Sequence, residues 1–291
     1  MRRAFATTEA ESRLSKIIFI TGTDTGVGKT LLAAALLLAL RRGGVRALAM
    51  KPFCSGGWGD VELIQQVQGP RPDRHQVAPF YFPQPLAPLA AARASGRSIS
   101  LHEAKRAIMM MARKGERLIV EGVGGVLAPL GTSGPGLEFA VADLIAELDC
   151  DVVVVAPNRL GVINHTCLTV EALRVRGVER IVVVLMEQAP RCKVPQEKDL
   201  DADYSVRTNA LLLRELLRGI VVLECPFLGP NADSLGQLKQ SLKKLKKTLA
   251  SIGSPDSFCA RLRNRRGPRQ SREGAVGPKR LKAKKDRLKD R

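Results

Sequence analysis

A short apolar run, a glycine-rich loop and an apolar helical stretch follow one another near the N-terminus, and this order limits the fold of the 291-residue chain most strongly. The run Ile17–Thr21 is rich in isoleucine and predicts a buried strand, while the Ala- and Leu-rich stretch Lys29–Arg42 predicts a helix. The loop between them contains Gly22, Gly26 and Gly28. A strand that leads directly into a helix is half of a β-α-β unit, so this segment indicates a parallel sheet.

The same loop predicts a phosphate-binding site. Its glycines let the backbone curl so that successive N–H groups point at phosphate oxygens, and the helix N-terminus adds a partial positive charge. Lys29 can reach the terminal phosphates of a nucleotide, and the Thr30 hydroxyl can ligate Mg²⁺. The strict G-x4-G-K-[ST] pattern requires glycine where this chain has Thr23, so the loop is one residue longer when it is counted from Gly22.

The chain up to residue 224 continues to alternate apolar runs with helical stretches. Most runs are continuously apolar, as expected for strands that helices cover on both faces. The further strands are expected at Val45–Met50, Arg117–Val120, Val152–Ala156, Ile181–Met186 and Ile220–Leu223. The further helices are expected at Leu101–Lys114, Glu138–Leu148, His165–Arg176 and Val206–Arg218. The sequence therefore predicts an α/β fold, with a doubly wound, mainly parallel sheet, a P-loop and helices on both faces.

Positive charge is concentrated at the C-terminal end. The formal net charge is +19, of which residues 251–291 carry +10 and the lysines of residues 237–250 another +5. Apolar residues at steps of three and four from Leu235 to Ile252 predict one amphipathic helix, which is either packed on the domain or a self-associating seam. We predict a disordered extension at residues 1–16, one domain at 17–253 and a basic disordered tail at 254–291. Such a tail could bind nucleic acid through its phosphate backbone.

Composition favours a cytoplasmic protein without a membrane span. The six cysteines are far apart and form no C-x-x-C pair, and we expect Cys54, Cys150 and Cys225 to be buried free thiols. The longest apolar run has ten residues, whereas a membrane span needs about 20. The first sixteen residues resemble a transit peptide in their Arg, Ser and Thr content, but Glu9 and Glu11 argue against one.

Three charged residues follow predicted strands, where open α/β sheets bind their ligands. Glu121 ends the third strand and precedes Gly122-Val123-Gly124-Gly125, along which a ligand can approach the backbone. Asp60 follows the second strand by a glycine-rich loop and is a candidate either for metal binding or for the N-cap of a helix. Lys51 ends the second strand and faces the same crevice. The carboxylates are hard oxygen ligands that suit Mg²⁺ with a nucleotide.

A further polar cluster follows the strand Val152–Ala156. Asn164 or Thr166 could cap the next helix, whose exposed N–H groups would suit an anion. His165 is one of three scattered histidines, so we expect no zinc site.

Four motifs in this order resemble those of the dethiobiotin synthetases, the ATP-dependent carboxylases of biotin synthesis. They are residues 21–30 of the phosphate-binding loop, Lys51-Pro52 with Ser55-Gly56, residues 120–125, and residues 160–165. The long loop that begins Thr-Gly-Thr-Asp-Thr is fairly specific to this family. The resemblance covers about residues 17–233.

The resemblance implies a homodimer that uses MgATP, CO2 and 7,8-diaminononanoate. One substrate amine becomes a carbamate, ATP phosphorylates it, and the second amine closes a cyclic urea with loss of phosphate. Lys51 and Lys29 would be the catalytic residues, Lys51 neutralising the carbamate and Lys29 acting on the moving phosphoryl group. Mg²⁺ would be held by Thr30, Asp60 and Glu121.

The same resemblance implies the remaining site residues. The nucleotide-binding positions would be Thr23, Asp24, Gly26, Val27, Gly28, Lys29, Thr30, Leu31, Asp60, Glu121, Gly122, Val123, Gly124, Met186, Glu187, Pro226 and Phe227. The substrate-binding positions would be Lys51, Ser55, Gly161, Val162, Ile163, Asn164 and His165. The last five would bind the distant carboxylate of the substrate from across the dimer interface.

Two departures from the family pattern stand out. Met186 occupies the place of an asparagine that reads the adenine edge, and Ala87-Pro88-Leu89 stands where many members have Ser-Pro-His. The alternatives are another deviant P-loop protein, such as an amidating synthetase or a partitioning ATPase, and a nucleic-acid-binding protein that works through the tail. A partitioning ATPase normally has a lysine near the start of the loop, where this chain has Thr23 and Asp24.

Overall fold

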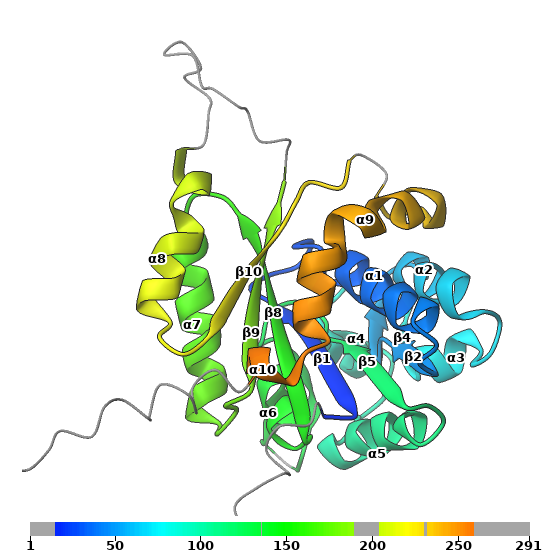
Figure 1. Ribbon diagram of the computed structural model, residues 1–291. Helices are drawn as coiled ribbons and strands as arrows, with labels where there is room; N and C mark the ends of the chain where they lie inside the picture. The colour runs from blue at the N-terminus through cyan, green and yellow to red at the C-terminus, as the bar shows by residue number, and fades with distance from the viewer. Residues whose placement is uncertain (1–14, 135, 189–203, 230–231, 259–291) are drawn as a thin grey trace, which may run out of the picture.

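Six parallel strands form the central sheet in a computed structural model, which describes residues 15–134, 136–188, 204–229 and 232–258 (Figure 1). In spatial order they are β10 (Val221–Cys225), β9 (Ile181–Glu187), β8 (Cys150–Asn158), β1 (Ile17–Gly22), β5 (Arg117–Glu121) and β2 (Ala47–Met50). The chain adds β2 and β5 on one side of β1 and then β8, β9 and β10 on the other. This is the predicted doubly wound sheet, and its two halves meet at β1.

Helices cover both faces of the sheet, which explains why β1 and β8 are buried along their whole length. One face carries α1 (Lys29–Arg42), α2 (Gly59–Gln68) and α9 (Leu235–Ile252). The other face carries α5 (Leu101–Ala112), α6 (Val141–Ala146), α7 (Val162–Val175) and α8 (Asn209–Leu216). Figure 1 shows α7 and α8 on one side of the sheet and α1 and α9 on the other.

Shorter elements flank this core. β3 (Phe53–Ser55) pairs in parallel with β4 (Phe80–Phe82), and β6 (Pro129–Thr132) pairs antiparallel with β7 (Glu138–Ala140). The remaining elements are α3 (Arg74–Val77), α4 (Pro88–Ala94), the 3-10 helix η2 (Tyr204–Arg207) and α10 (Pro255–Phe258).

The prediction of a helix from Glu138 was wrong in its first turn. Pairing with β6 holds residues 138–140 as a strand and leaves Phe139 only 3% exposed. The helix begins later because the Asp143 carboxylate accepts a hydrogen bond from the Ala140 N–H at 2.7 Å, which satisfies a free donor at the start of α6.

The outer edge of β2 is covered by a side chain. Gln68, at the end of α2, accepts a hydrogen bond from the Ala49 N–H at 2.9 Å and donates one to the Ala49 carbonyl at 3.3 Å. The amide therefore takes the place of a neighbouring strand on an otherwise open edge. It also ties the end of α2, the helix that contains Asp60, to the strand that leads into Lys51.

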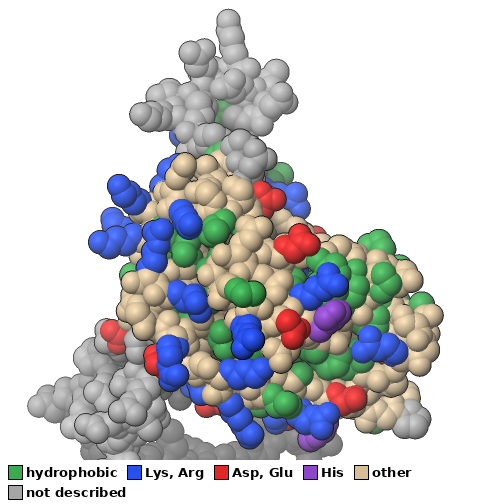
Figure 2. All heavy atoms as spheres, turned by 90° about the vertical axis from the view of Figure 1, so that its right-hand side faces the viewer, with side chains coloured by type: hydrophobic (Ala, Val, Ile, Leu, Met, Phe, Trp, Pro, Cys, Tyr) green, Lys and Arg blue, Asp and Glu red, His purple; other side chains and the backbone are tan. Residues whose placement is uncertain are grey.

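The amphipathic helix predicted at Leu235–Ile252 is confirmed as α9. Its apolar face, with Leu238 and Leu245 fully buried, packs on α1 and β10, so the domain covers the face that a self-associating seam would need. The five lysines of α9 are exposed. On the face drawn in Figure 2, Lys and Arg side chains are spread out with acidic side chains between them.

Two further expectations concern the ends of the chain and the cysteines. The predicted extension and tail fall largely on residues 1–14 and 259–291, outside the described residues. Cys54, Cys150 and Cys225 are buried free thiols, as predicted. Within the part of the chain that the structure describes, the helices are too short or too polar to cross a membrane.

Candidate functional site

A cleft of about 820 Å³ opens at the carboxyl ends of β1, β5 and β2. Its walls include the phosphate-binding loop, the start of α2 and the segment before α4. The predicted site residues that line it are Gly26, Gly28, Lys29, Thr30, Leu31, Lys51, Ser55, Asp60, Glu121, Val123 and Gly124. The sheet topology therefore brings together the first three predicted motifs, as expected for the switch point of an open α/β sheet.

Two glycines give the phosphate-binding loop its shape. Gly26 and Gly28 have φ values of +73° and +99°, a region that residues with a Cβ atom rarely adopt. The start of the loop is tied to the sheet because the Thr23 N–H donates to the Val155 carbonyl of β8 at 3.0 Å. Gly28 immediately precedes α1, so the free N–H groups of the helix start face the loop.

The side chain of Lys29 is held inside this loop. Its ammonium donates to the Asp24 carbonyl at 2.7 Å, and the residue is 6% exposed. Burial lowers the pKa of Lys29 from 10.5 to about 8, although the charge of Glu121 opposes this shift. A phosphate bound in the loop would stabilise this buried ammonium and offset the cost of its desolvation.

A second buried cation lies beside the loop. The Lys51 ammonium donates to Glu121 Oε1 at 2.8 Å and also to Asp60 Oδ2. Burial opposes the charge, but the two carboxylates outweigh it and raise the pKa of Lys51 above its usual value. Burial also opposes ionisation of Asp60, yet Lys51 lowers the pKa of that carboxyl. Lys51 and Asp60 therefore stabilise each other's charged forms.

The oxygen atoms around this cluster fit a magnesium ion. The Thr30 hydroxyl donates to Glu121 Oε1 at 2.6 Å, while Oε2 of the same carboxylate is buried without a hydrogen-bond partner among the described residues. In that part of the chain no cluster of three or more His, Cys, Asp or Glu side chains could form an all-protein metal site. One hydroxyl and two carboxylates leave positions for phosphate oxygens and water, which is how Mg²⁺ is usually bound with nucleotides.

The glycines after β5 have a packing role. A Cβ atom on Gly122 would lie 2.9 Å from Phe19 Cε1, and one on Gly125 would lie 3.3 Å from the Thr23 carbonyl. This segment therefore packs closely against β1 and the phosphate-binding loop. Close approach of a ligand was the prediction for these residues, and Val123 and Gly124 do line the cleft.

Asp60 is not the N-cap of α2, which corrects one of its two predicted roles. The helix begins at Gly59 with Trp58 as its N-cap residue, so Asp60 lies within the first turn. There its carboxylate lines the cleft and contacts Lys51. Ser55 lines the same cleft at the end of β3. The chain leaves the central sheet after Pro52, because β3 pairs with β4 instead.

The positions predicted to bind the base gather at the ends of β9 and β10. Met186 pairs in register with Cys225, which Pro226 and Phe227 follow. The Met186 side chain packs against the phosphate-binding loop, with its Cε atom 3.1 Å from where a Cβ on Gly28 would lie. Glu187 is 8% exposed and accepts a hydrogen bond from Asn158 at 2.9 Å. None of these predicted positions is part of the cleft lining, and all but Glu187 are apolar.

The fourth motif lies away from the cleft within one chain. Gly161, with a φ of +89°, is the N-cap residue of α7, so neither Asn164 nor Thr166 caps this helix. The early helix start is possible because glycine adopts the left-handed conformation there. Asn164 and His165 are exposed on the first turn. The structure thus does not bring residues 161–165 to Lys51 in the same chain.

Sequence reasoning missed an aromatic cluster that lies next to Gly59 and Asp60 of the cleft wall along the chain. Trp58 stacks on Tyr81, with Arg74 over the Trp58 ring. The available signal was that Trp58 is the only tryptophan of the chain and lies in the glycine-rich loop before Asp60.

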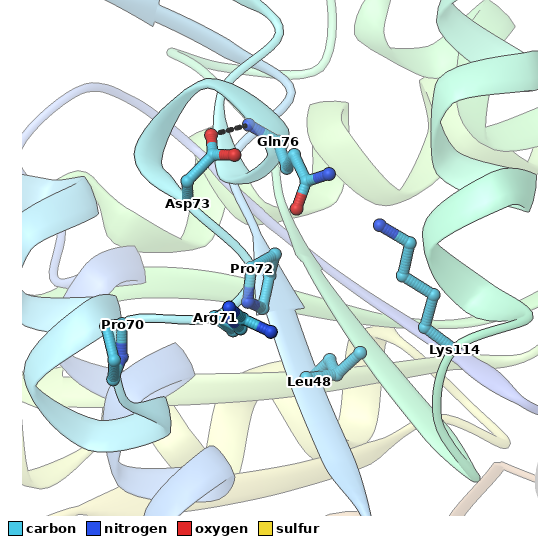
Figure 3. Close-up of a pocket in the computed structure, with 7 residues that line it drawn as sticks. All are labelled: Leu48, Pro70, Arg71, Pro72, Asp73, Gln76 and Lys114. Atoms are coloured by element: carbon cyan, nitrogen blue, oxygen red, sulfur yellow. Dashed lines mark hydrogen bonds between the residues drawn. The ribbon is translucent and has the colours of Figure 1, made fainter.

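A second hollow, of about 670 Å³, lies beside β2 (Figure 3). It is lined by Leu48, Pro70, Arg71, Pro72, Asp73, Gln76 and Lys114. Figure 3 shows Asp73 bonded to Gln76, whose backbone N–H donates to the carboxylate at 3.0 Å. This hollow contains none of the predicted site residues.

Comparison with known proteins identifies relatives of the chain. The AAA domain family matches residues 16–216. Among solved structures, the MinD cell division protein of Aquifex aeolicus is 13% identical, with a TM-score of 0.43 over 87% of this chain and 99% of that chain. The chain is 43% identical to an ATP-dependent dethiobiotin synthetase of Anaeromyxobacter dehalogenans over 60% of this chain and 77% of the relative. It is 38% identical to that of Xanthomonas axonopodis pv. citri over 62% of this chain and 81% of the relative. With these two relatives matched over most of their length, the chain belongs to the family of ATP-dependent dethiobiotin synthetases.

Proposed function

We propose that the protein converts 7,8-diaminononanoate, CO2 and ATP into dethiobiotin, ADP and phosphate. The observation that carries the proposal is the buried ammonium of Lys51, which lies between Asp60 and Glu121 next to Thr30 of the phosphate-binding site. A cation at this point can neutralise a small anion, and an anion that is to be phosphorylated must lie beside the terminal phosphate.

The proposed reaction has three steps. One substrate amine adds to CO2 and loses a proton, which gives a carbamate. A carbamate oxygen attacks the terminal phosphorus of ATP, the bond to the bridging oxygen breaks, and ADP leaves. The second amine then attacks the carbonyl carbon and loses its proton as phosphate leaves with the electrons of the C–O bond, which closes the cyclic urea. No oxidant or reductant is required.

The chain supplies charges for each step. Lys51 would balance the carbamate, and the Ser55 hydroxyl, in the same cleft, would donate a hydrogen bond to it. Lys29 would contact the transferred phosphoryl group and regain full protonation there. Thr30, Asp60 and Glu121 would hold Mg²⁺, which supplies further positive charge to the phosphate oxygens.

A homodimer would complete the substrate site. Residues 161–165 lie at the start of α7, away from the cleft, and α7 and α8 pack side by side on one side of the molecule (Figure 1). Both helices expose large apolar side chains: Leu168 is 57%, Val175 79%, Leu211 58% and Leu216 59% exposed. An exposed apolar face of this kind is typical of a protein interface. The partner's copy of residues 161–165 would then bind the distant carboxylate of the substrate.

The dimer is tested by placing a charge in this face. Leu168→Glu and Leu216→Glu should give a monomer in sedimentation and lower turnover, whereas Leu137→Glu, 63% exposed elsewhere, should change neither. A dimer that survives both substitutions would place the interface on another surface.

The reaction is tested by product analysis with diaminononanoate, bicarbonate and MgATP. We expect dethiobiotin and phosphate in equal amounts from the native chain and far less of both, in the same time, from Lys51→Ala. ATP hydrolysis without dethiobiotin, or ATP use that depends on a different carboxylate or amine substrate, would contradict the proposed function.

A further inference from the structure

Trp58, which lies between Lys51 and Asp60 along the chain, belongs to an aromatic stack. The rings of Trp58 and Tyr81 lie 3.7 Å apart between centroids and 15° from parallel. The Arg74 guanidinium lies 4.9 Å from the Trp58 ring centroid, and His75 meets the same ring edge-on at 5.4 Å. Stacked and cation–π contacts of this kind restrict the position of a ring more than apolar contact alone.

The stack locates the start of α2. The N-cap residue of this helix is Trp58, and it makes no side-chain capping hydrogen bond. The first helical residue is Gly59, which has low helix propensity. Neither local feature specifies where the helix begins, since side-chain caps normally do so. The stacked ring of Trp58 fixes this residue in place instead of a side-chain cap. The backbone carbonyl of Trp58 then accepts a hydrogen bond from the Glu62 N–H at 2.8 Å.

The loop before Trp58 is tied to the same partner. The Tyr81 hydroxyl donates to the Gly56 carbonyl at 2.8 Å, and the Gly56 N–H donates to the Phe82 carbonyl at 3.0 Å. Ser55 pairs with Phe82 in the β3–β4 sheet. The short loop that leads from Ser55 to Asp60 is therefore fixed to β4 at two points, the backbone of Gly56 and the ring of Trp58.

The helix α3 links the stack to Lys51. The Lys51 N–H donates to the Val77 carbonyl at 3.0 Å, and Val77 ends the same four-residue helix that contains Arg74 and His75. The helix α3 thus contacts both the backbone of Lys51 and the Trp58 ring, two residues before Asp60. The position of α3 therefore affects how the Lys51 ammonium meets the Asp60 carboxylate.

We propose that Trp58, through its stack on Tyr81, is a positioning residue that sets the Asp60 carboxylate against Lys51 and Thr30 for binding of the magnesium nucleotide. The inference rests on the proposed function, in which Asp60 is a ligand of Mg²⁺. Trp58 acts through the start of α2 and does not line the cleft itself.

The test compares nucleotide binding with and without magnesium. In the full chain, Trp58→Ala should weaken the binding of Mg²⁺ with a non-hydrolysable ATP analogue by about 10- to 100-fold, the usual cost of losing an outer support of a metal ligand. Binding of the same analogue in EDTA should stay unchanged, because the ring contacts of Trp58 are with Tyr81, His75 and Arg74, outside the phosphate-binding loop. Turnover should fall mainly in kcat, with little change in the KM for diaminononanoate.

Conservative variants separate positioning from general stability. Trp58→Phe keeps a ring on Tyr81 and should restore most of the magnesium dependence. His75→Ala removes only the edge contact and is the matched control, with binding expected to stay within about twofold of the native chain, since edge contacts of an exposed residue are weak. Trp58 is the only tryptophan, so its emission in the native chain should also change when the magnesium analogue is added.

Equal losses with and without magnesium, or no rescue by Trp58→Phe, would overturn the inference and leave the stack a purely stabilising contact. Native magnesium dependence in Trp58→Ala would do the same. These binding measurements do not depend on which product forms, so a chain that made no dethiobiotin would contradict the proposed function while the positioning role was still tested.

Discussion

The two halves of the carboxyl edge of the sheet bury polar groups in opposite ways. Beside β1, β5 and β2, the buried groups are charges of both signs, Lys51 and Glu121, and the half-exposed Asp60 carboxylate pairs with Lys51; all three line the cleft. Beside β8 and β9, the buried groups are mainly amides: Asn209 donates to Asn158 at 2.9 Å, and Asn158 donates to Glu187 at 2.9 Å.

This difference separates function from stability. Burying an ion pair costs desolvation that its own attraction barely offsets, so such a cluster is weak evidence of a stabilising role and points to a charged ligand. Buried amides that satisfy one another hold elements together instead. We therefore expect substitutions in the charged half to change turnover and substitutions in the amide half to change the free energy of unfolding.

The largest effect is expected from Lys51→Ala. It should lower kcat by about 10²- to 10³-fold, because it removes the charge opposite the carbamate. ATP affinity, measured by calorimetry, should change little. Lys51→Arg keeps the charge and should retain more activity than the alanine variant. Near-normal turnover in Lys51→Ala would contradict the division between function and stability, because the charged half would then have a structural role.

The matching substitution in the other half is Asn209→Ala. Asn209 is 2% exposed and donates to Asn158, to the Arg159 carbonyl and to Ser205. Its loss should lower the free energy of unfolding by about 1–3 kcal/mol, the cost of leaving buried partners unsatisfied. Urea titration measures this change. Turnover per folded molecule should stay native, and a selective loss of kcat would show that the amide half takes part in the reaction.

The charged half could be predicted from the sequence because its signals are local. Lys29 and Thr30 belong to one loop, and Lys51 and Glu121 each end an apolar run, so strand order alone brings them together. Asp60 was placed in the cleft but also, wrongly, at a helix cap. The N-cap residue is instead Trp58, which stacks on Tyr81 of β4. Because β4 comes later in the chain, no local sequence pattern predicts that contact.

The amide half and the proposed dimer face could not be derived in this way. Nothing in the sequence pairs Asn158 with Asn209, because their contact depends on how α8 packs beside the end of β8. The loss of residues 138–140 from a predicted helix has the same origin, since pairing between β6 and β7 outweighs the local pattern.

A smaller effect is expected at Met186, which lies on β9 and packs against Gly28 of the phosphate-binding loop. A thioether accepts hydrogen bonds only weakly, whereas the asparagine found here in the family can both donate and accept. Each lost neutral hydrogen bond is worth about 0.5–1.5 kcal/mol, or very roughly 2- to 100-fold in selectivity for one or two bonds. We expect GTP or CTP to support turnover within about two orders of magnitude of ATP on this basis.

Replacing Met186 by Asn should widen the gap between ATP and the other nucleotides. The values of kcat/KM for ATP, GTP and CTP measure it. The Met186 side chain packs on the loop at Gly28, so a polarizable contact remains and overall nucleotide affinity need not collapse. Strong ATP preference in the native chain, unchanged in Met186→Asn, would remove this residue from the base site and leave the backbone near Pro226 and Phe227 to read adenine.

The smallest expected effect is the uptake of a fraction of a proton at Lys29 when ATP binds. Burial lowers its pKa from 10.5 to about 8, so at pH 8 about half of the folded molecules hold it neutral. Nucleotide phosphates favour the ammonium, so ATP should bind with an uptake of about half a proton at pH 8 and almost none at pH 6. Calorimetry in two buffers of different ionisation enthalpy measures the uptake, which Lys29→Met should abolish.

The lowered pKa of Lys29 also determines whether the free energy of unfolding rises or falls with pH. Between pH 8 and 10.5 the unfolded chain binds more protons at Lys29 than the folded chain does, so this residue makes the free energy of unfolding rise with pH across that window. Lys51 acts above it, because its pKa is raised: its contribution is fully present below 10.5 and is lost only at higher pH. The difference in the free energy of unfolding between the native and Lys29→Met chains should therefore change steadily from pH 8 to 10.5 and stay constant at higher pH. A flat difference would mean that the loop holds Lys29 charged without a ligand, and that both cations of the charged half are fully ionised before ATP arrives.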